Sequence, residues 1–202
     1  MKIICIGRNY SDHAKEMNSP IPEEPLFFLK PDTALFRDKN FYYPEFTSDL
    51  HHEIELVVKI AKVGKHISVD NAPKYYNEIG LGIDFTARDI QKQCKAKGLP
   101  WEKAKAFDNS AVISQQFIKK EDLDLSNISF SLEKNNTTVQ SGNSVDMLFH
   151  INQLISHVSK YITLKTGDLI YTGTPQGVGP VEIGDQLTGY LDEKAMFTVN
   201  IK

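Results

Sequence analysis

Three acidic residues in this chain could together hold a metal ion. Glu53 and Glu55 are two positions apart in the β-prone segment HHEIELVVKIAK, and Asp84 lies in a second such segment, GLGIDFTARDI. Alternate side chains of a strand point to the same face, so Glu53 and Glu55 are predicted to lie side by side. A third carboxylate from another strand would complete a cluster of oxygen ligands suited to a hard divalent cation such as Mg2+.

Acidic residues at this spacing more often mark the solvent-exposed face of a strand. Three features favour burial: the histidines before Glu53, the apolar residues around Glu55, and the lack of any other charge in GLGIDF. A buried carboxylate without a partner is costly, and one cation would relieve all three.

A second candidate pair is His13 with Glu16, three residues apart on a predicted helix and therefore on one face. A carboxylate beside an imidazole fixes its tautomer and raises its basicity, which suits a general base for water. The same spacing also fits an ordinary pair on a surface helix.

Further along, Lys105 could offset the excess negative charge of three carboxylates, although most lysines are simply solvated. Arg88 and Gln91 are again three apart on a predicted helix directly after Asp84, where they could grip a substrate carboxylate. An exposed helix face is the alternative. With Mg2+ and Lys105, three carboxylates would sum to zero charge, and Arg88 would supply the positive potential for an anionic substrate.

The glycine-rich segment GTPQGVG begins at Gly173 and matches neither a Walker loop nor a dinucleotide-binding fingerprint. Its glycines permit a tight turn in which backbone N–H groups and the Thr174 hydroxyl could meet an anion, or it could be a plain turn.

These residues must be positioned by a fold rich in short strands. We predict strands at 2–6, 26–29, 51–63, 79–85, 111–118, 168–172, 186–191 and 196–201, and a hairpin within 129–140 that turns at Asn135-Asn136. Helices are predicted from Asn9 or Ser11 to about Met17, over 86–97, and over 145–160, with a short helix near 72–78. The fold class is therefore α+β and sheet-dominated, without regular βαβ alternation.

The length of 202 residues fits one domain, residues 1–202. A net charge of −3 without a basic cluster argues against nucleic-acid binding. No apolar run approaches the roughly 20 residues of a membrane span, and the N-terminal apolar run is too short for a signal peptide. Cys5 and Cys94 have no partner at metal-ligand spacing and are predicted to be buried reduced thiols, which points to the cytoplasm.

Taken in chain order, six segments resemble the fumarylacetoacetate hydrolase family: GRNYSDHAKEM, FLKPDTA, HHEIELVVKI, DFTARDIQ, KGLPWEKAKAFD and GDLIYTGTPQGVGP. The resemblance covers nearly the whole chain, except that residues 119–145 carry none of these motifs. The length and the GRNYSDH start are most similar to the single-domain acylpyruvase and oxaloacetate decarboxylase branch.

This resemblance implies a mixed β-roll around a central metal, usually in a homodimer, with residues 8–25 as a mobile lid. It implies a site whose members have three roles: metal ligands Glu53, Glu55 and Asp84 for Mg2+ or Mn2+; catalytic residues His13, Glu16 and Lys105; and substrate-binding residues Arg8, Lys30, Arg88, Gln91 and Thr174. The prolines at 20, 22 and 25 separate the lid helix from the rest of the chain, as a hinge would.

The implied activity is cleavage of a C–C bond in a small 2-oxo acid, by acylpyruvate hydrolysis or oxaloacetate decarboxylation, through a pyruvate enolate. Two alternatives stay open. One is isomerisation or decarboxylation of a 2-hydroxy-diene-dioate by the same family chemistry. The other is a non-catalytic metal-binding scaffold, against which the retained His13, Glu16 and Lys105 argue.

Overall fold

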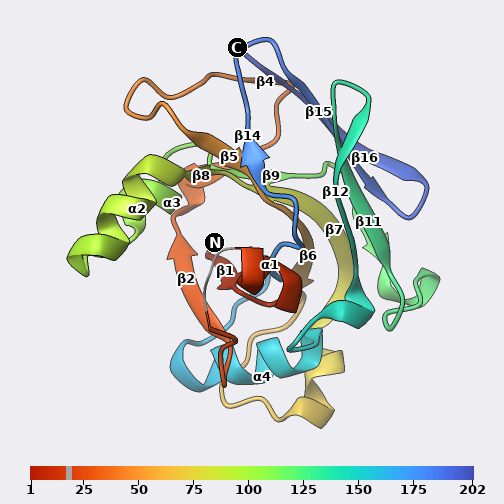
Figure 1. Cartoon of the computed structure of the whole chain (residues 1–202). Helices are drawn as coiled ribbons and strands as arrows, with labels where there is room; N and C mark the ends of the chain where they lie inside the picture. The colour runs from red at the N-terminus through yellow and green to blue at the C-terminus, as the bar shows by residue number, and fades with distance from the viewer. Residues whose placement is uncertain (17–19) are drawn as a thin grey trace.

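A computed structural model describes residues 1–16 and 20–202, in which the strands form three sheets (Figure 1). The largest sheet has eight strands and is mixed, because β1 pairs with β13 and β3 with β9 in parallel while its other pairs are antiparallel. Its order is β2 (Leu26–Lys30), β1 (Ile3–Gly7), β13 (Leu169–Tyr171), β6 (Ile54–Ile60), β7 (Tyr76–Asp84), β9 (Ala111–Ile113) and β3 (Leu35–Phe36), with β10 (Ile118–Lys119) beside β7.

The other two sheets are smaller. One has the order β12 (Thr137–Asn143), β11 (Ser129–Lys134), β15 (Gln186–Leu191), β16 (Lys194–Ile201) and β4 (Asn40–Phe41). The other is formed by β14 (Gly179–Pro180), β5 (Leu50–His52) and β8 (Thr86–Ala87).

The helices among the described residues are short. The α-helices are α1 (Ser11–Glu16), α2 (Arg88–Lys97), α3 (Glu102–Lys105) and α4 (Ile151–Tyr161). The 3-10 turns are η1 (Asp32–Ala34), η2 (Val69–Lys74), η3 (Lys120–Asp122) and η4 (Ser144–Asp146). Within the described ranges, no helix is both long and apolar enough to cross a membrane.

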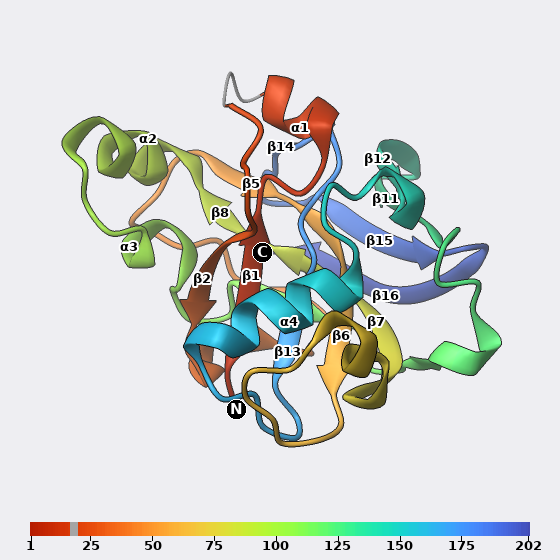
Figure 2. The same cartoon turned by 90° about the horizontal axis from the view of Figure 1, so that it is seen from below.

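The central strands of the large sheet are buried on both faces, and the alternation of side chains along each strand determines which face a residue joins. In β1, Ile4 and Ile6 belong to the main core with α4 and the five-stranded sheet, whereas Ile3 and Cys5 belong to a smaller cluster with Val57 and Tyr171. Figure 1 shows the sheet curling around α1, with α4 and the five-stranded sheet outside, and Figure 2 shows α1 at one end of the roll. The predicted sheet-dominated α+β roll is confirmed.

Several predicted elements are confirmed nearly to the residue. Helix α2 ends at Lys97 and is capped by Gly98, whose φ of 63° gives the left-handed conformation that glycine favours. The β11–β12 hairpin turns at Asn135 and Asn136, both at positive φ. Cys5 and Cys94 are free, buried thiols, as predicted.

Four predicted elements had the wrong bounds. The strand predicted over 111–118 is divided into β9, which ends at Ile113, and β10, which begins at Ile118. The helix predicted over 145–160 begins only at Ile151, because Met147 forms a bridge with Tyr10 and the Leu148 N–H bonds to the Asn9 carbonyl. Near 72–78 the chain forms the 3-10 turn η2 and then enters β7. The strand predicted over 51–63 is divided into β5 and β6 at Glu53 and ends at Ile60. The predicted end of the first helix, Met17, lies outside the described residues.

Candidate active site

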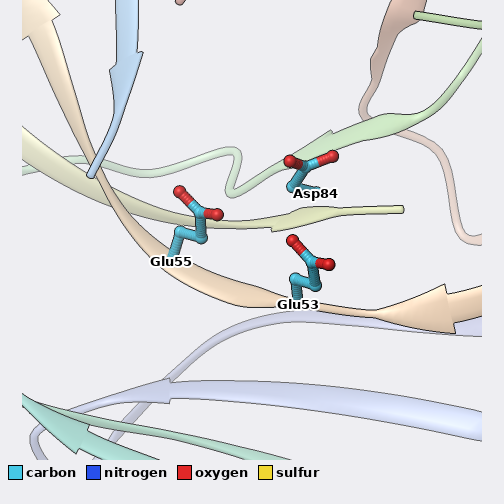
Figure 3. Close-up of side chains that lie close together, drawn as sticks. All are labelled: Glu53, Glu55 and Asp84. Atoms are coloured by element: carbon cyan, nitrogen blue, oxygen red, sulfur yellow. The ribbon is translucent and has the colours of Figure 1, made fainter. Parts of the chain in front are cut away.

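Glu53, Glu55 and Asp84 converge where β6 begins and β7 ends. The two strands are antiparallel, with Glu55 opposite Gly82 and the Asp84 N–H donating to the Glu53 carbonyl at 2.8 Å. One carboxylate oxygen from each residue lies within 4.8 Å of the others, and all three side chains are buried. Figure 3 shows the carboxylates grouped between the ends of the strands. The structure therefore brings the predicted ligands together, although Glu53 occupies the break between two strands rather than one continuous strand.

Three buried cations contact two of these carboxylates. The Nζ of Lys105 lies 2.8 Å from Glu53 Oε2 and 2.8 Å from Asp84 Oδ2. Arg88 Nη2 lies 2.6 Å from Glu53 Oε1, and Lys30 Nζ lies 2.6 Å from Asp84 Oδ1. The sequence argument balanced the carboxylates with Mg2+ and Lys105 and assigned Arg88 and Lys30 to the substrate, so it did not foresee that these two cations also pair with the carboxylates.

Within the described part of the chain, Glu55 has no such cation against its carboxylate. Its Oε2 accepts the Gly173 N–H at 2.7 Å. Burial, together with the negative charges of Asp84 and Glu53, raises the pKa of the Glu55 carboxyl well above its usual value. Three oxygen donors, one without a counter-ion, fit a hard divalent cation, which Glu53, Glu55 and Asp84 would hold.

The Glu53 carboxylate is held in its charged form. Burial alone would raise its pKa, but the charges of Lys105 and Arg88 outweigh burial and hold the pKa of Glu53 well below its usual value. The pKa of Lys105 is raised in the same way: burial lowers it, and Asp84 and Glu53 more than compensate. Glu53 and Lys105 are thus a fixed anion and a fixed cation beside the proposed metal position.

The candidate base reaches the same pocket from α1. The buried His13 ring lines the pocket, and its Nδ1 lies 3.2 Å from Glu16 Oε2, which leaves Nε2 as the ring nitrogen available to the pocket. The other Glu16 oxygen accepts the Gly177 N–H at 3.1 Å, so Glu16 also joins α1 to the glycine-rich loop. Spacing predicted the pair, and the structure adds this second contact.

Most of the remaining predicted site residues also line this pocket, which is bounded by Ile6, Gly7, Arg8, His13, Phe28, Glu53, Glu55, Asp84, Arg88, Gln91, Lys95, Trp101, Lys105 and Thr174. Gln91 accepts a hydrogen bond from Arg88 Nη1 at 2.8 Å, which orients the guanidinium. Lys30 does not reach the pocket wall. It lies behind Asp84, where its Nζ also donates to the carbonyls of Ser110 and Phe85.

The sequence argument missed Lys95, which lines the pocket and lies over the Trp101 ring, 5.5 Å from its centroid. Its position one helical turn after Gln91 was the available signal. It also missed Asn9, whose buried amide donates to the Thr172 and Phe149 carbonyls at 2.8 and 3.0 Å. Gly173 packs against Asn9, since a Cβ there would lie 2.7 Å from the Asn9 Cβ.

Comparison with known proteins places these observations in a family. The chain is 42% identical over 200 residues to the oxaloacetate tautomerase YcgM of Escherichia coli (strain K12), covering 98% of this chain and 91% of that protein. The fumarylpyruvate hydrolase of Pseudomonas aeruginosa, crystallised with Mn2+ and pyruvate, matches with a TM-score of 0.94 at 34% identity, covering 100% of this chain and 89% of that one.

A third similar protein is the 5-carboxymethyl-2-hydroxymuconate delta-isomerase of Mycobacterium smegmatis, with a TM-score of 0.87 at 33% identity, covering 99% of this chain and 78% of that one. The family model for the C-terminal domain of fumarylacetoacetate hydrolase matches residues 2–201. With nearly every residue matched, this chain belongs to the fumarylacetoacetate hydrolase family.

Proposed function

We propose that this protein is a divalent-metal-dependent enzyme that acts on a small dicarboxylic 2-oxo acid through its enolate, with oxaloacetate as the substrate that its pocket fits best. The observation that carries the proposal is that three buried cations already balance three converging carboxylates. The reactions open to that enolate are decarboxylation and interconversion of the keto and enol forms.

The charge balance favours a dianion. Lys30, Arg88 and Lys105 together cancel the charges of Glu53, Glu55 and Asp84, so a divalent ion would leave a surplus of two positive charges. Arg8 and Lys95 add cationic side chains to the pocket wall. Oxaloacetate carries two carboxylates, whereas acetylpyruvate carries one.

A divalent ion held by Glu53, Glu55 and Asp84 would supply Lewis-acid stabilisation of negative charge on the 2-oxo oxygen. Arg88, steadied by Gln91, is placed to bind the adjacent carboxylate, and the Lys105 ammonium provides a fixed positive charge beside the developing enolate. In tautomerisation, His13 Nε2 takes a proton from C3, the C–H electron pair forms the C2–C3 double bond, and the 2-oxo oxygen is then protonated.

In decarboxylation the same residues would bind oxaloacetate, but a different bond would break. The C3–C4 bond breaks, CO2 leaves, and its electron pair forms the C2–C3 double bond of the enolate, which becomes pyruvate when C3 is protonated. The similarity to an oxaloacetate tautomerase supports this substrate. The sequence argument considered hydrolysis, decarboxylation and diene-dioate isomerisation, but not keto–enol interconversion of oxaloacetate.

Hydrolysis of an acylpyruvate is a second candidate, favoured by the His13–Glu16 pair and the similarity to a fumarylpyruvate hydrolase. In this reaction His13 would remove a proton from water, and the hydroxide would add to the acyl carbonyl before the C–C bond breaks. Fumarylpyruvate, which is also a dianion, suits the charge balance better than acetylpyruvate. The similarity to a muconate isomerase keeps a diene-dioate as a third substrate for assay.

The deciding experiment compares substrates on one preparation. Protein stripped with EDTA and reloaded with Mg2+ or Mn2+ is assayed with oxaloacetate, fumarylpyruvate, acetylpyruvate and a hydroxymuconate-type dioate. We expect metal-dependent turnover, with a higher kcat/KM for oxaloacetate than for acetylpyruvate. Full activity in EDTA, or no turnover of any 2-oxo acid with metal, would refute the proposal.

Two further expectations belong with this proposal. Light scattering on the purified protein tests the expected homodimer, and fractionation of the source cells tests the expected cytoplasmic location. The proposed lid, residues 8–25, is tested by protease sensitivity with and without oxalate, a mimic of the pyruvate enolate.

A further inference from the structure

Gln140 lies in the part of the chain that carries none of the family motifs. It nevertheless contacts both the segment around Glu53 and the glycine-rich loop. It belongs to β12 and is buried, with an exposed fraction of 2%. The pairing of β11 with β12 shifts register beside it: Leu132 pairs with Gln140 and Glu133 with Thr138, so Val139 is an extra residue. A bulge of this kind re-aims the neighbouring side chain, here toward the large sheet.

The oxygen and the nitrogen of the Gln140 amide each have two hydrogen-bond partners. Its Oε1 accepts from the Ile54 N–H at 3.0 Å and lies 2.8 Å from His52 Nδ1. Its Nε2 donates to the Pro175 carbonyl at 3.1 Å and to Thr174 Oγ1 at 2.9 Å. Because a backbone N–H can only donate and a backbone carbonyl can only accept, the orientation of the amide is fixed.

These contacts join two elements that are remote in sequence. His52 and Ile54 flank the candidate ligand Glu53, whereas Thr174 and Pro175 follow Gly173, which donates to Glu55. Gly177 of the same loop packs on the bulge, since a Cβ there would lie 2.5 Å from the Val139 carbonyl oxygen. Gln140 therefore ties the glycine-rich loop to the chain segment that carries Glu53.

The fixed orientation of the Gln140 amide also determines that the Thr174 hydroxyl accepts a hydrogen bond from it. Since Oγ1 accepts from Gln140, the hydroxyl hydrogen is directed elsewhere, and Thr174 lines the pocket. A hydroxyl in this setting is a hydrogen-bond donor for an oxygen of a bound acid. We propose that Gln140 is a positioning residue that presents the Thr174 hydroxyl as a donor to the substrate. The proposal rests on the proposed function, because it requires an oxo acid in the pocket.

The test replaces the hydrogen-bond donor at position 140 with an acceptor, so that the hydrogen bond to Thr174 would run in the opposite direction. Gln140→Glu keeps the shape and the acceptor for Ile54, but a carboxylate would accept the Thr174 hydrogen and withdraw it from the ligand. Gln140→Met keeps the length, removes all four contacts, and leaves the Thr174 hydrogen free. Binding of oxalate at saturating Mn2+ is measured by calorimetry, with Mn2+ affinity measured separately for each variant and Gln186→Glu as the exposed control.

We expect Gln140→Glu and Thr174→Val each to raise the Kd of oxalate about tenfold, and Gln140→Met and Thr174→Ser to raise it less. In the Thr174→Val background, Gln140→Glu should add no more than about threefold, because no hydroxyl remains to be turned. The effect of Gln140→Glu in the Thr174→Val protein also measures how much the added negative charge alone weakens oxalate binding.

A purely structural role predicts the reverse order, with Gln140→Met worse than Gln140→Glu. That order would overturn the proposal and leave the proposed function intact. The same holds if the Kd of oxalate rises in the double variant by the product of the two single increases. If one Gln140 variant does not fold, the other combined with Thr174→Val still decides it. Failure of the wild-type protein with Mn2+ to bind oxalate would overturn both proposals.

Discussion

Lys30 and Asp84 form an ion pair in the protein interior, with Nζ 2.6 Å from Oδ1 and almost no solvent exposure on either side chain. The Lys30 Nζ also donates to two backbone carbonyls and lies over the Phe107 ring, 5.9 Å from its centroid. We therefore propose that Lys30 acts on Asp84 as a charge partner rather than on the substrate. In the absence of metal, Lys30 and Lys105 together neutralise a carboxylate that would otherwise be buried with a single counter-ion.

The first prediction follows from this pair. Lys30→Met should lower the free energy of unfolding of metal-free protein by about 3–5 kcal/mol, because it leaves a buried charge with one partner fewer. Excess Mn2+ should restore part of the loss, since the bound ion would share the charge of Asp84. Urea unfolding in EDTA and in Mn2+ measures both.

Lys59→Met is the matched control, since Lys59 pairs with Glu78 at 2.8 Å on the surface, where both side chains are more than a third exposed. It should cost less than about 1 kcal/mol. Equal losses for Lys30→Met in EDTA and in Mn2+ would contradict a role as charge partner.

The sequence predicted the parts of the site that depend on local spacing. Glu53 and Glu55 share a face because strand side chains alternate, and His13 meets Glu16 because residues three apart on a helix are neighbours. Asp84 could be added because a lone charge in an apolar strand needs a partner. Each of these inferences starts from the conformation or composition of one segment.

The remaining features depend on contacts between distant segments. Lys30 meets Asp84, and Gln140 meets Ile54 and Thr174, only because the strands pair and curl as they do. The start of α4 also escaped prediction, since Met147 has helical spacing but is held by its bridge to Tyr10. In each case tertiary contacts override a local pattern or supply a partner that no local pattern contains.

A second prediction concerns Glu55, the carboxylate that receives no cation among the described side chains. Glu55→Gln should raise the stability of metal-free protein by about 1–3 kcal/mol, because it removes a buried charge that lacks a counter-ion. The same change should abolish the increase in Tm that Mn2+ gives the wild-type protein. Calorimetric melting in EDTA and in Mn2+ measures both effects.

Glu78→Gln, at a partly exposed strand residue, serves as the control and should change neither quantity appreciably. A Glu55→Gln protein that is less stable in EDTA and still binds Mn2+ would show that Glu55 has a structural role instead.

A third prediction tests the preference for dianions. Lys95→Met should raise the KM for oxaloacetate about three- to tenfold and change the KM for acetylpyruvate by less than about twofold, because only the first substrate carries a second carboxylate for the pocket wall. Arg8→Gln should have the same selectivity with a larger effect, since Arg8 is less exposed than Lys95. Steady-state kinetics on both substrates measure the change.

Lys92→Met is the control on the same helix, because Lys92 is 70% exposed and faces Asp49 rather than the pocket. Equal changes in KM for both substrates in the Lys95→Met protein would assign Lys95 to the wall of the pocket without a role in charge selection.

The last prediction separates the two reactions that would share the enolate. His13→Ala should lower kcat for acylpyruvate hydrolysis by roughly 10²–10⁴-fold, the usual contribution of a general base, because His13 would take the proton from the attacking water. Decarboxylation of oxaloacetate needs no activated water, so it should fall far less, whereas tautomerisation should fall with hydrolysis if His13 removes the C3 proton. Binding of oxalate to the Mn2+-loaded variant should persist, because Arg88 and the three carboxylates, which would hold the metal and the acid, are all kept in this variant. Parallel losses in all three reactions together with lost oxalate binding would instead mean that His13 holds α1 in place, and unchanged hydrolysis would remove the His13–Glu16 pair from the mechanism.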